Sequence, residues 1–391
     1  MSHIYVRLSA FYFCNCVALG LILPFWGLYM EKQGYSAPEI ALVSALLMLT
    51  NVIAPPVWGW WADQSGRRLT LIRWGAAAAV LCFAVNLVHS DLHLMVLAFL
   101  CCGFFWQGIN AQFEALTLTL LAGQSRNYSR IRLWGSVGFV CAVSGGGWLF
   151  DQISLDQLPL LVVLSLALMW LSTMLVPQPH AKARHYPDPS PVGPLLRQPA
   201  VLLILSAIAL IYFSHGTYYG FYSIYLQQHY DNSQIGLLWS LAVAAELLAF
   251  AMLPKWLKRY PLHHLLLISV GATCLRWLGL AFGADWLGVL LGCQLLHALS
   301  FSAVHACTME WLHRRFRIQQ QGRAQALYYA FCVGAGQAGG TIASGWFWQY
   351  SQQAAFLLSA LIAAVALLLL MLGQHGLVSD HTDRTCAGPD H

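Results

Sequence analysis

Long apolar segments recur along the whole chain and alternate with short polar connections. Each segment holds about 20 residues or more, the length that an α-helix needs to cross roughly 30 Å of hydrocarbon. The apolar residues follow one another without the alternation of a membrane-spanning β-strand, so a β-barrel is excluded. The pattern predicts an all-α integral membrane protein. Its 12 transmembrane helices cover residues 8–30, 38–61, 69–89, 93–121, 131–150, 158–177, 200–228, 234–256, 263–283, 285–312, 323–350 and 354–375.

The composition changes the range of functions that this chain can have. Of 391 residues, 59% are hydrophobic and only 9% are charged, and the mean hydropathy is +0.61. Soluble domains carry about 25% charged residues, because charged side chains cover a surface that faces water. This chain has too few charges for such a surface, so an ordinary soluble enzyme is excluded.

The basic residues mark one side of the membrane. All Lys and Arg residues except Lys32 and Arg276 fall near the termini or in alternate connections between the predicted helices. By the positive-inside rule these connections and both termini are cytoplasmic, which predicts a multi-pass protein of the cell (inner) membrane. The net charge of +5 therefore reflects the basic residues on the cytoplasmic side of the membrane, and we expect no nucleic-acid partner. No small-residue cleavage site follows the first apolar run, so we expect that run to remain as the first span.

The sequence predicts no metal, cofactor or nucleotide site. The 11 cysteines include no Cys-x-x-Cys pair and no partner at metal-ligand spacing, so we interpret them as packing residues. The chain also has no Gly-x-x-x-x-Gly-Lys-Ser/Thr phosphate loop. Energy for transport must therefore come from an ion gradient, or transport is passive.

The chain divides at its longest internal polar stretch, residues 178–199, which holds six prolines. We predict a six-helix bundle over 1–177, a cytoplasmic linker over 178–199, a second bundle over 200–375 and a cytoplasmic tail over 376–391. The segment 25–29, FWGLY, lines up with 221–225, FYSIY, 196 residues later, and both helix 5 and helix 11 end in Gly-Trp. Two like-oriented repeats of six helices are one known transporter architecture. The alternative is that glycine is simply common in membrane helices.

The connection after helix 2 resembles the signature of the major facilitator superfamily. It reads Gly-Trp-Trp-Ala-Asp-Gln-Ser-Gly-Arg-Arg over residues 59–68. The resemblance implies a conformational latch of Asp63, Gly66, Arg67 and Arg68. The sequence departs from the signature at Gln64, and the equivalent connection 254–259 lacks both the Asp and the Gly.

Further motifs resemble the phenylpropionate permease family and, more distantly, the lactose permease and nucleoside–proton symporter families. The motifs are Leu23-Pro24-Phe25-Trp26, Arg132-Leu133-Trp134-Gly135-Ser136, His215 with Tyr218-Tyr219-Gly220-Phe221, Leu238-Trp239-Ser240 with Glu246, Arg276-Trp277, His297 and His305. The resemblance spans essentially the whole chain. It implies an aromatic carboxylic acid, such as 3-phenylpropionate, as the substrate.

Two helices carry polar or aromatic stripes inside the predicted spans. Gln107, Asn110 and Glu114 share one face of helix 4, because residues three and seven apart lie on the same side of an α-helix. In helix 7 the corresponding residues are His215, Tyr218, Tyr219 and Tyr222. We predict that both stripes line a central cavity and bind substrate. The alternative is that they form hydrogen bonds between helices, which is the role that we expect for Asn15 and Asn51.

The second half holds the strongest signal for coupling to protons. Arg276 is the only Lys or Arg in the middle of a predicted span, and Glu246 lies midway along helix 8. A charge in hydrocarbon costs about 2.5–3.5 kcal/mol on insertion scales, so we expect Arg276 to pair with Glu246. His297 and His305 in helix 10 are expected to flank that pair and to pass or sense a proton. Arg276 is also a candidate partner for a substrate carboxylate. Glu310 is either a further member of this group of ionisable residues or only an ion-pair partner of Arg314 at the membrane interface.

These features favour a proton-coupled symporter that imports a small organic solute by alternating access. A sugar or nucleoside permease and a drug exporter are the alternatives of the same fold. An intramembrane enzyme is disfavoured, because no helix carries a His-Glu-x-x-His motif and the repeat would be unexplained. We expect a small-molecule substrate and the lipid bilayer as partners, the proton as coupling ion, no other cofactor, and a functional monomer.

Overall fold

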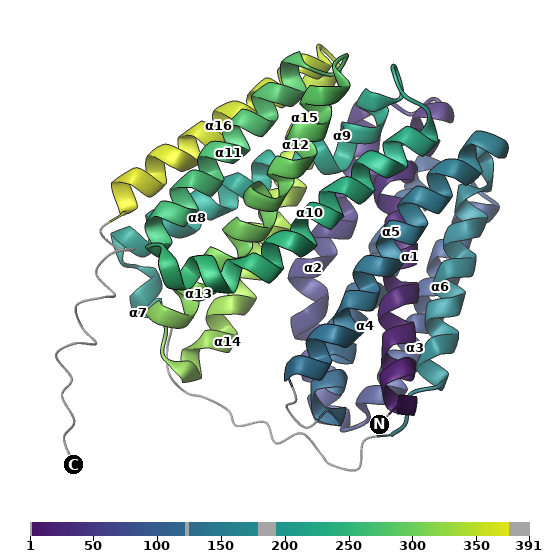
Figure 1. Ribbon diagram of the computed structural model, residues 1–391. Helices are drawn as coiled ribbons and strands as arrows, with labels where there is room; N and C mark the ends of the chain where they lie inside the picture. Colours follow the sequence, from purple (N-terminus) through teal and green to yellow (C-terminus); the bar gives the residue numbers. More distant parts are fainter. Residues whose placement is uncertain (1, 122–124, 179–192, 375–391) are drawn as a thin grey trace, which may run out of the picture. The chain divides into compact units, whose positions relative to one another are not determined.

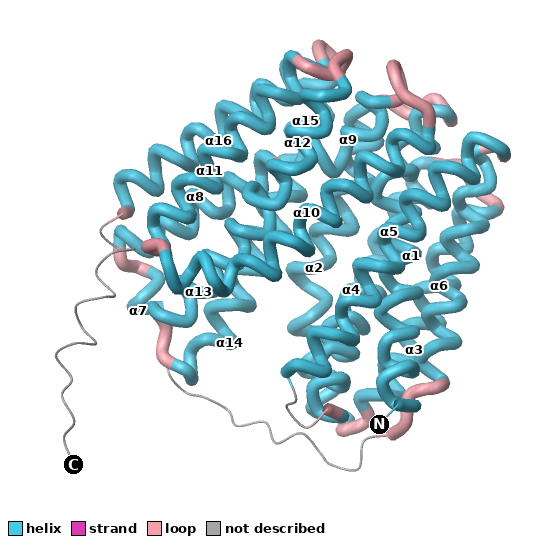
Figure 2. Tube along the Cα trace, viewed as in Figure 1, coloured by secondary structure: helices cyan, strands magenta, loops and turns pink. Residues whose placement is uncertain are grey.

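The computed structural model describes residues 2–121, 125–178 and 193–374, and these residues form helices, turns and no strand (Figures 1 and 2). The all-α fold predicted from the apolar segments is therefore confirmed. Most of the predicted linker, residues 179–192, and the predicted tail, 376–391, lie outside the described residues.

The long helices follow the predicted spans with shifted ends. The first half holds α1 (Ser2–Lys32), α2 (Ala37–Ser65), α3 (Arg68–Ala84), α4 (Leu92–Leu120), α5 (Ser125–Gln152) and α6 (Leu158–Met174). The second half holds α7 (Gly193–Leu196), α8 (Pro199–Ser214), α9 (Gly216–Leu226), α10 (Asn232–Arg259), α11 (Leu262–Phe282), α12 (Leu287–His297), α13 (Val304–Arg315), α14 (Ile318–Leu327), α15 (Gln337–Trp348) and α16 (Gln352–Gly373).

Three spans of the second half are interrupted. His215 separates α8 from α9, and the π-helix Ala298–Ala303 separates α12 from α13. A second π-helix, Tyr328–Gly336, joins α14 to α15. Extra residues in a π-helical turn re-aim the side chains around it, and such turns are frequent at functional sites.

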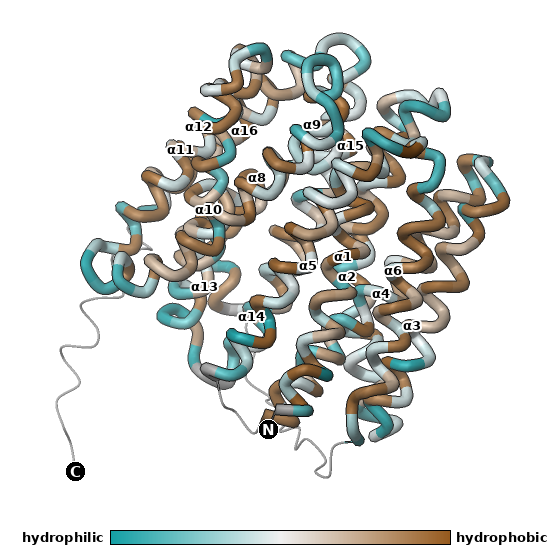
Figure 3. The backbone as a smooth tube through the Cα atoms, turned by 45° about the vertical axis from the view of Figure 1, so that its right-hand side comes forward, coloured by the Kyte–Doolittle hydropathy of each residue, from teal (hydrophilic) through white to brown (hydrophobic). Residues whose placement is uncertain are grey.

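Eleven helical segments of the described chain are long and apolar enough to cross a membrane. The remaining long helix runs from α14 to α15 and carries Gly334, Gly336, Gly339 and Gly340 among its apolar residues. Many large apolar side chains are exposed along the helices, for example Leu81 at 71% and Leu248 at 68%. Figure 3 shows apolar residues along the helix shafts and hydrophilic residues at the turns. Exposed apolar surface of this extent is stable against hydrocarbon rather than water.

The chain forms two compact units. Unit 1 comprises Met1–Tyr186 and Tyr218–Ser240, and unit 2 comprises Pro187–Thr217 and Leu241–His391. Most of α9 and the first turns of α10 therefore belong to unit 1, although the sequence repeat assigns them to the second bundle.

Close helix contacts in unit 1 depend on residues without side chains. α1 packs against α5 and α6, and α4 packs against α2 and α3. A Cβ atom at Gly138 of α5 would overlap the backbone of Phe13 in α1. The indole of Trp58 in α2 lies over Gly75 and Gly108 and is 1% exposed. Small residues let helix backbones approach closely in a membrane, where van der Waals packing drives their association.

Unit 2 is built around α16, which packs against both α8 and α11. Its core includes Ile204, Ile208, Leu266 and Leu370, each fully buried. Thr217, at the start of α9, links α15 to α16. Its Oγ1 lies 2.6 Å from Ser344 Oγ in α15 and 2.7 Å from Ser359 Oγ in α16. Hydrogen bonds of this kind hold helices together without exposing a polar group to lipid.

Candidate functional site

Arg276 of α11 is fully buried in unit 2 and binds groups from the neighbouring span. Its Nε donates to the backbone carbonyl of Cys293 at 3.0 Å, and its Nη1 donates to Ser300 Oγ at 3.3 Å. Nη2 lies 3.5 Å from Gln294 Oε1, and the guanidinium sits 4.6 Å from the ring centre of Trp277. These acceptors come from α12 and the π-helix that follows it. Arg276 therefore holds this part of the span in place.

The carboxylate of Glu246 in α10 lies within hydrogen-bond distance of a histidine ring. Its Oε1 lies 2.7 Å from His297 Nε2, at the last residue of α12, and the two side chains are 18% and 3% exposed. The structure places His297 in direct contact with Glu246, and the expected pairing of Arg276 with Glu246 remains a prediction. Spacing along a helix predicts depth in the membrane, but the rotation of each helix decides which side chains meet.

A second histidine joins this group through the break between α8 and α9. The ring centres of His215 and His297 are 6.1 Å apart, and His215 meets the Trp277 ring edge-on at 4.9 Å. His215 Nδ1 lies 2.8 Å from the carbonyl of Ile211. We call Glu246, His297, His215 and Arg276 the buried polar cluster.

His305 belongs to a different group. Its Nδ1 lies 2.8 Å from the hydroxyl of Tyr328, and that hydroxyl lies 2.6 Å from the hydroxyl of Tyr212. This chain of hydrogen bonds joins α13, the second π-helix and α8. Both histidines were expected to flank the pair of Glu246 and Arg276; the structure places His297 against Glu246 and His305 against Tyr328.

The polar stripe of α4 meets α5 in unit 1. Arg132 Nη1 lies 2.8 Å from Glu114 Oε1 and 2.8 Å from the hydroxyl of Tyr128, which also donates to Glu114. The side chains of Glu114 and Arg132 are 44% and 57% exposed, so this pair stays accessible. Gln107 and Asn110 are half-buried on the same helix. Asn15 accepts a 2.6 Å hydrogen bond from Trp106 Nε1, which is the linking role expected for it.

Sequence analysis did not single out Arg132 or Tyr128 as site residues. Arg132 was counted with the basic connection after helix 4, although α5 begins at Ser125 and places it two turns inside a helix. A signal was present, because Arg132 follows Tyr128 at helical spacing and opens a motif of the resembled family. Gln294 and Ser300 were also missed, since neutral polar residues are ordinary in membrane helices.

The tyrosines of α9 are packed rather than open. Tyr218 and Tyr222 are fully buried, with ring centres 4.7 Å and 5.8 Å from that of Trp239 in α10. Trp239 Nε1 donates to Ser223 Oγ at 3.0 Å. Tyr219 is half-buried and is the most accessible of the three.

The connection between α2 and α3 has the geometry of a closed turn. Gly66 ends α2 with φ 63°, a left-handed conformation that glycine adopts without strain. Asp63 Oδ1 lies 3.2 Å from Arg68 Nη2 across the turn. Arg73 donates to the carbonyl of Val176 at 3.1 Å, just after α6.

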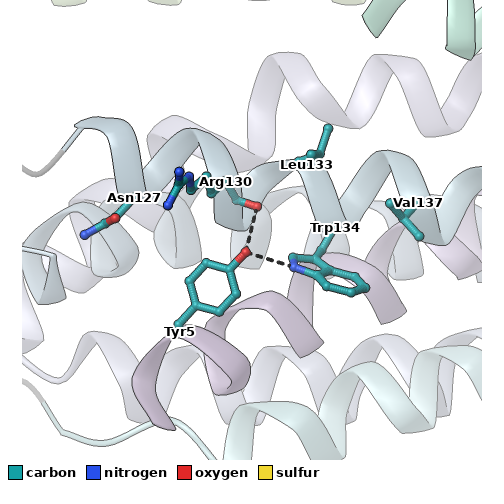
Figure 4. Close-up of a pocket in the computed structure, with 6 residues that line it drawn as sticks. All are labelled: Tyr5, Asn127, Arg130, Leu133, Trp134 and Val137. Carbon is teal, nitrogen blue, oxygen red and sulfur yellow. Dashed lines mark hydrogen bonds between the residues drawn. The ribbon is translucent and has the colours of Figure 1, made fainter. Parts of the chain in front are cut away.

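A surface hollow of about 450 Å³ lies between the first turns of α1 and α5 (Figure 4). Trp134 Nε1 donates to the hydroxyl of Tyr5 at 3.1 Å, and that hydroxyl donates to the carbonyl of Arg130 at 3.4 Å. None of the predicted substrate or coupling residues lines this hollow. It therefore contributes nothing to the candidate site.

Comparison with known proteins places these residues in a family. The MFS_1 like family matches residues 5–358. The "Probable 3-phenylpropionic acid transporter" of Escherichia coli (strain K12) is 30% identical over 370 residues, covering 92% of this chain and 95% of that protein. The "Maltose permease" of Geobacillus stearothermophilus is 26% identical over 384 residues, covering 93% and 92%.

Solved structures agree on the fold. The crystal structure of the nucleoside transporter NupG has a TM-score of 0.80 and 18% identity, and the match covers 96% of this chain and 99% of that one. At this identity the likeness concerns the fold alone. The family match over most of the chain, together with the all-α membrane fold, shows that the protein belongs to the MFS_1 like family of the major facilitator superfamily and is a transporter, not an enzyme.

Proposed function

We propose that this transporter is a proton-coupled symporter that imports a small aromatic carboxylic acid, such as 3-phenylpropionate, across the inner membrane. The observation that carries the proposal is the 2.7 Å contact of Glu246 with His297 beside the buried Arg276. The similarity to a protein named as a probable 3-phenylpropionic acid transporter supports the substrate class. The distribution of Lys and Arg supports cytoplasmic termini.

Glu246 is the proposed proton carrier. Its carboxylate is 18% exposed, so a proton has access to a group that is otherwise enclosed by the protein. Protonation of either Glu246 or His297 changes the charge of their 2.7 Å contact, and a charge change is costly where water is scarce. Arg276 supplies a fixed positive charge to the same cluster. The proposed coupling is that proton binding to this pair changes which arrangement of the helices is stable.

The accessible pair of Glu114 and Arg132 is the proposed site for the substrate carboxylate. A planar carboxylate fits the guanidinium of Arg132 through two parallel hydrogen bonds. Gln107, Asn110 and Tyr219 are the proposed neighbours, since amides and a tyrosine ring suit the polar and aromatic ends of such a substrate. His215, Tyr218, Tyr222 and Arg276, also expected to bind substrate, are fully buried, so substrate contact with them requires rearrangement.

A sugar permease is the second candidate, and the similarity to a maltose permease favours it. Sugars are recognised by aromatic faces together with carboxylates and amides, which the same stripe provides. A sugar has no negative charge, so its binding would not need the positive charge of Arg132.

The substrate class is tested by thermal shift of the purified protein with 3-phenylpropionate, its neutral amide, maltose and a nucleoside. We expect a concentration-dependent rise of Tm with 3-phenylpropionate and little with the amide, because ligand binding to the folded state stabilises it. Uptake of 3-phenylpropionate into proteoliposomes under an imposed pH gradient then reports coupling. A rise of Tm with maltose or the nucleoside, and none with 3-phenylpropionate, would contradict the proposal that the substrate is an aromatic carboxylic acid.

Replacing Glu246 by Gln should abolish accumulation driven by a pH gradient while exchange of labelled for unlabelled substrate continues. The amide keeps the size of the side chain but cannot bind and release a proton. The matched control is Glu310→Gln. Glu310 lies in α13, where its carboxylate pairs at 2.6 Å with Arg314, one turn further along that helix. Accumulation at the parent level in Glu246→Gln would refute the coupling role and leave Glu114 as the next candidate.

Arg132→Gln should raise the KM for 3-phenylpropionate by about 10-fold or more, the loss expected for a charge-assisted hydrogen bond. Glu114→Gln and Tyr219→Ala should also weaken binding, with membrane insertion intact. Arg130→Gln, on the same helix but lining the surface hollow, is the control and should leave KM unchanged. The proposal fails if Arg130 and Arg132 variants bind substrate equally well.

Asp63→Asn should lower the turnover rate several-fold and change the inward/outward population, with little change of substrate affinity for either state. The Asp63–Arg68 pair is partly exposed, so its loss should cost less than about 1 kcal/mol of stability. Arg68→Gln should reproduce the effect, because it removes the other partner. Unchanged turnover in both variants would exclude a latch.

A further inference from the structure

The end of α5 and the start of α10 are fastened together in unit 1. Asp151, next to last in α5, accepts backbone hydrogen bonds from Asn232 and Ser233, each at 3.0 Å. The hydroxyl of Ser233 also donates to this carboxylate, and the amide of Asn232 donates to the carbonyl of Phe150 at 3.3 Å. We call these contacts the α5–α10 clasp.

The clasp depends on both helix ends. The first N–H groups of a helix have no acceptor within it, and Asp151 supplies one to two of them in α10. A carboxylate is favoured at the positive N-terminal end of a helix and disfavoured at the negative C-terminal end. Asp151 lies at the C-terminal end of its own helix. Its position is therefore stabilised by α10, and separation of the helices would remove that stabilisation.

Beyond the clasp the two backbones touch directly. A Cβ atom at Gly147 would overlap the backbone of Asn232, and one at Gly236 would overlap the carbonyl of Val143. One turn further, Ser144 Oγ and Ser240 Oγ are 2.6 Å apart. The backbones of α5 and α10 are therefore in close contact at these positions.

An aromatic layer closes the contact at its inner end. Phe139 of α5 and Trp239 of α10 are 8% and 3% exposed, with ring centres 6.5 Å apart. Trp239 in turn covers Tyr218 and Tyr222. A polar fastening, a glycine contact and an aromatic layer therefore follow one another along the same pair of helices.

The clasp is connected to the buried polar cluster through one helix. α10 runs without interruption from Asn232 to Arg259 and carries Glu246. Thirteen residues separate Ser233 from Glu246, which corresponds to about 20 Å along a helix. A shift of the first turns of α10 is therefore passed to the residue that bonds His297.

We propose that Asp151 is the positioning residue of a gate: its carboxylate holds α10 against α5 and closes this end of the transport path, and the clasp must release in every cycle. The physical basis is that α5 and α10 come from different sequence repeats, which must move against each other for alternating access. The inference rests on the chain being a transporter; its cross-linking test needs neither the proposed substrate nor the proposed coupling ion, whereas its transport readout rests on the proposed substrate.

Disulfide trapping tests the gate without a substrate. Ser144→Cys and Ser240→Cys are combined in a chain in which the adjacent Cys141 is replaced by Ser, and each single variant serves as a control. Oxidation in membranes should cross-link the pair, because the two hydroxyl oxygens already lie 2.6 Å apart and a disulfide needs about 2 Å. Adding Asp151→Asn should slow cross-linking at least threefold. Asp151→Glu keeps the charge and should recover most of the rate.

The matched control is Asp156→Asn, which removes a carboxylate in the next connection that pairs with Lys32 at 2.7 Å. It should leave the cross-linking rate unchanged, because it does not contact α10. A failure of the parent pair to cross-link, or equal rates in the Asp151→Asn and Asp156→Asn chains, would overturn the proposal.

Transport gives the second readout, with 3-phenylpropionate as the probe. The oxidised pair should lose at least 10-fold in uptake and exchange, and reduction should restore both. Asp151→Asn should change the maximal rate more than the KM, since it alters the population of gate states and does not touch the binding residues. Normal transport by the oxidised, fully cross-linked protein would show that the clasp does not open in the cycle and would refute the gate.

Discussion

A charged side chain surrounded by hydrocarbon must find its partners inside the protein, and this constraint organises the polar residues of both units. Arg276 meets it with a carbonyl, a hydroxyl and an amide, together with the Trp277 ring. Glu246 meets it through His297. The remaining helix surface can then be apolar, which is why so few charges suffice for a chain of 391 residues.

α5 shows how one helix combines packing with chemistry. Gly138 brings it against α1, and Gly147 brings it against α10. Arg132 near its start and Asp151 at its end each bind a group on another helix. Because Gly147 leaves no side chain between the backbones of α5 and α10, Asp151 reaches the first turn of α10, which a wider spacing would put out of its range.

The sequence pointed to individual residues of the candidate site more clearly than to the contacts between them. Glu246, Arg276 and His297 were identified because ionisable residues inside a span are costly, and the structure places all three in unit 2. The contacts of Arg276 with Cys293, Gln294 and Ser300, and that of His297 with Glu246, were not predicted, because they depend on how each helix is rotated about its axis. Arg132 was missed because a basic residue near a helix end also serves topology, and only its contact with Glu114 reveals a second role.

The sequence by itself determined the all-α fold and the approximate span of each helix. These follow from hydropathy and from the 1.5 Å rise of a helix, which are local properties of the chain. Only the tertiary structure decided that His297 bonds Glu246, that His305 bonds Tyr328 instead, and that Asp151 fastens α5 to α10. Those contacts depend on the rotation of each helix about its axis, on the π-helical turns and on backbone approach at glycine. All three are settled by packing against other helices, far away in the sequence.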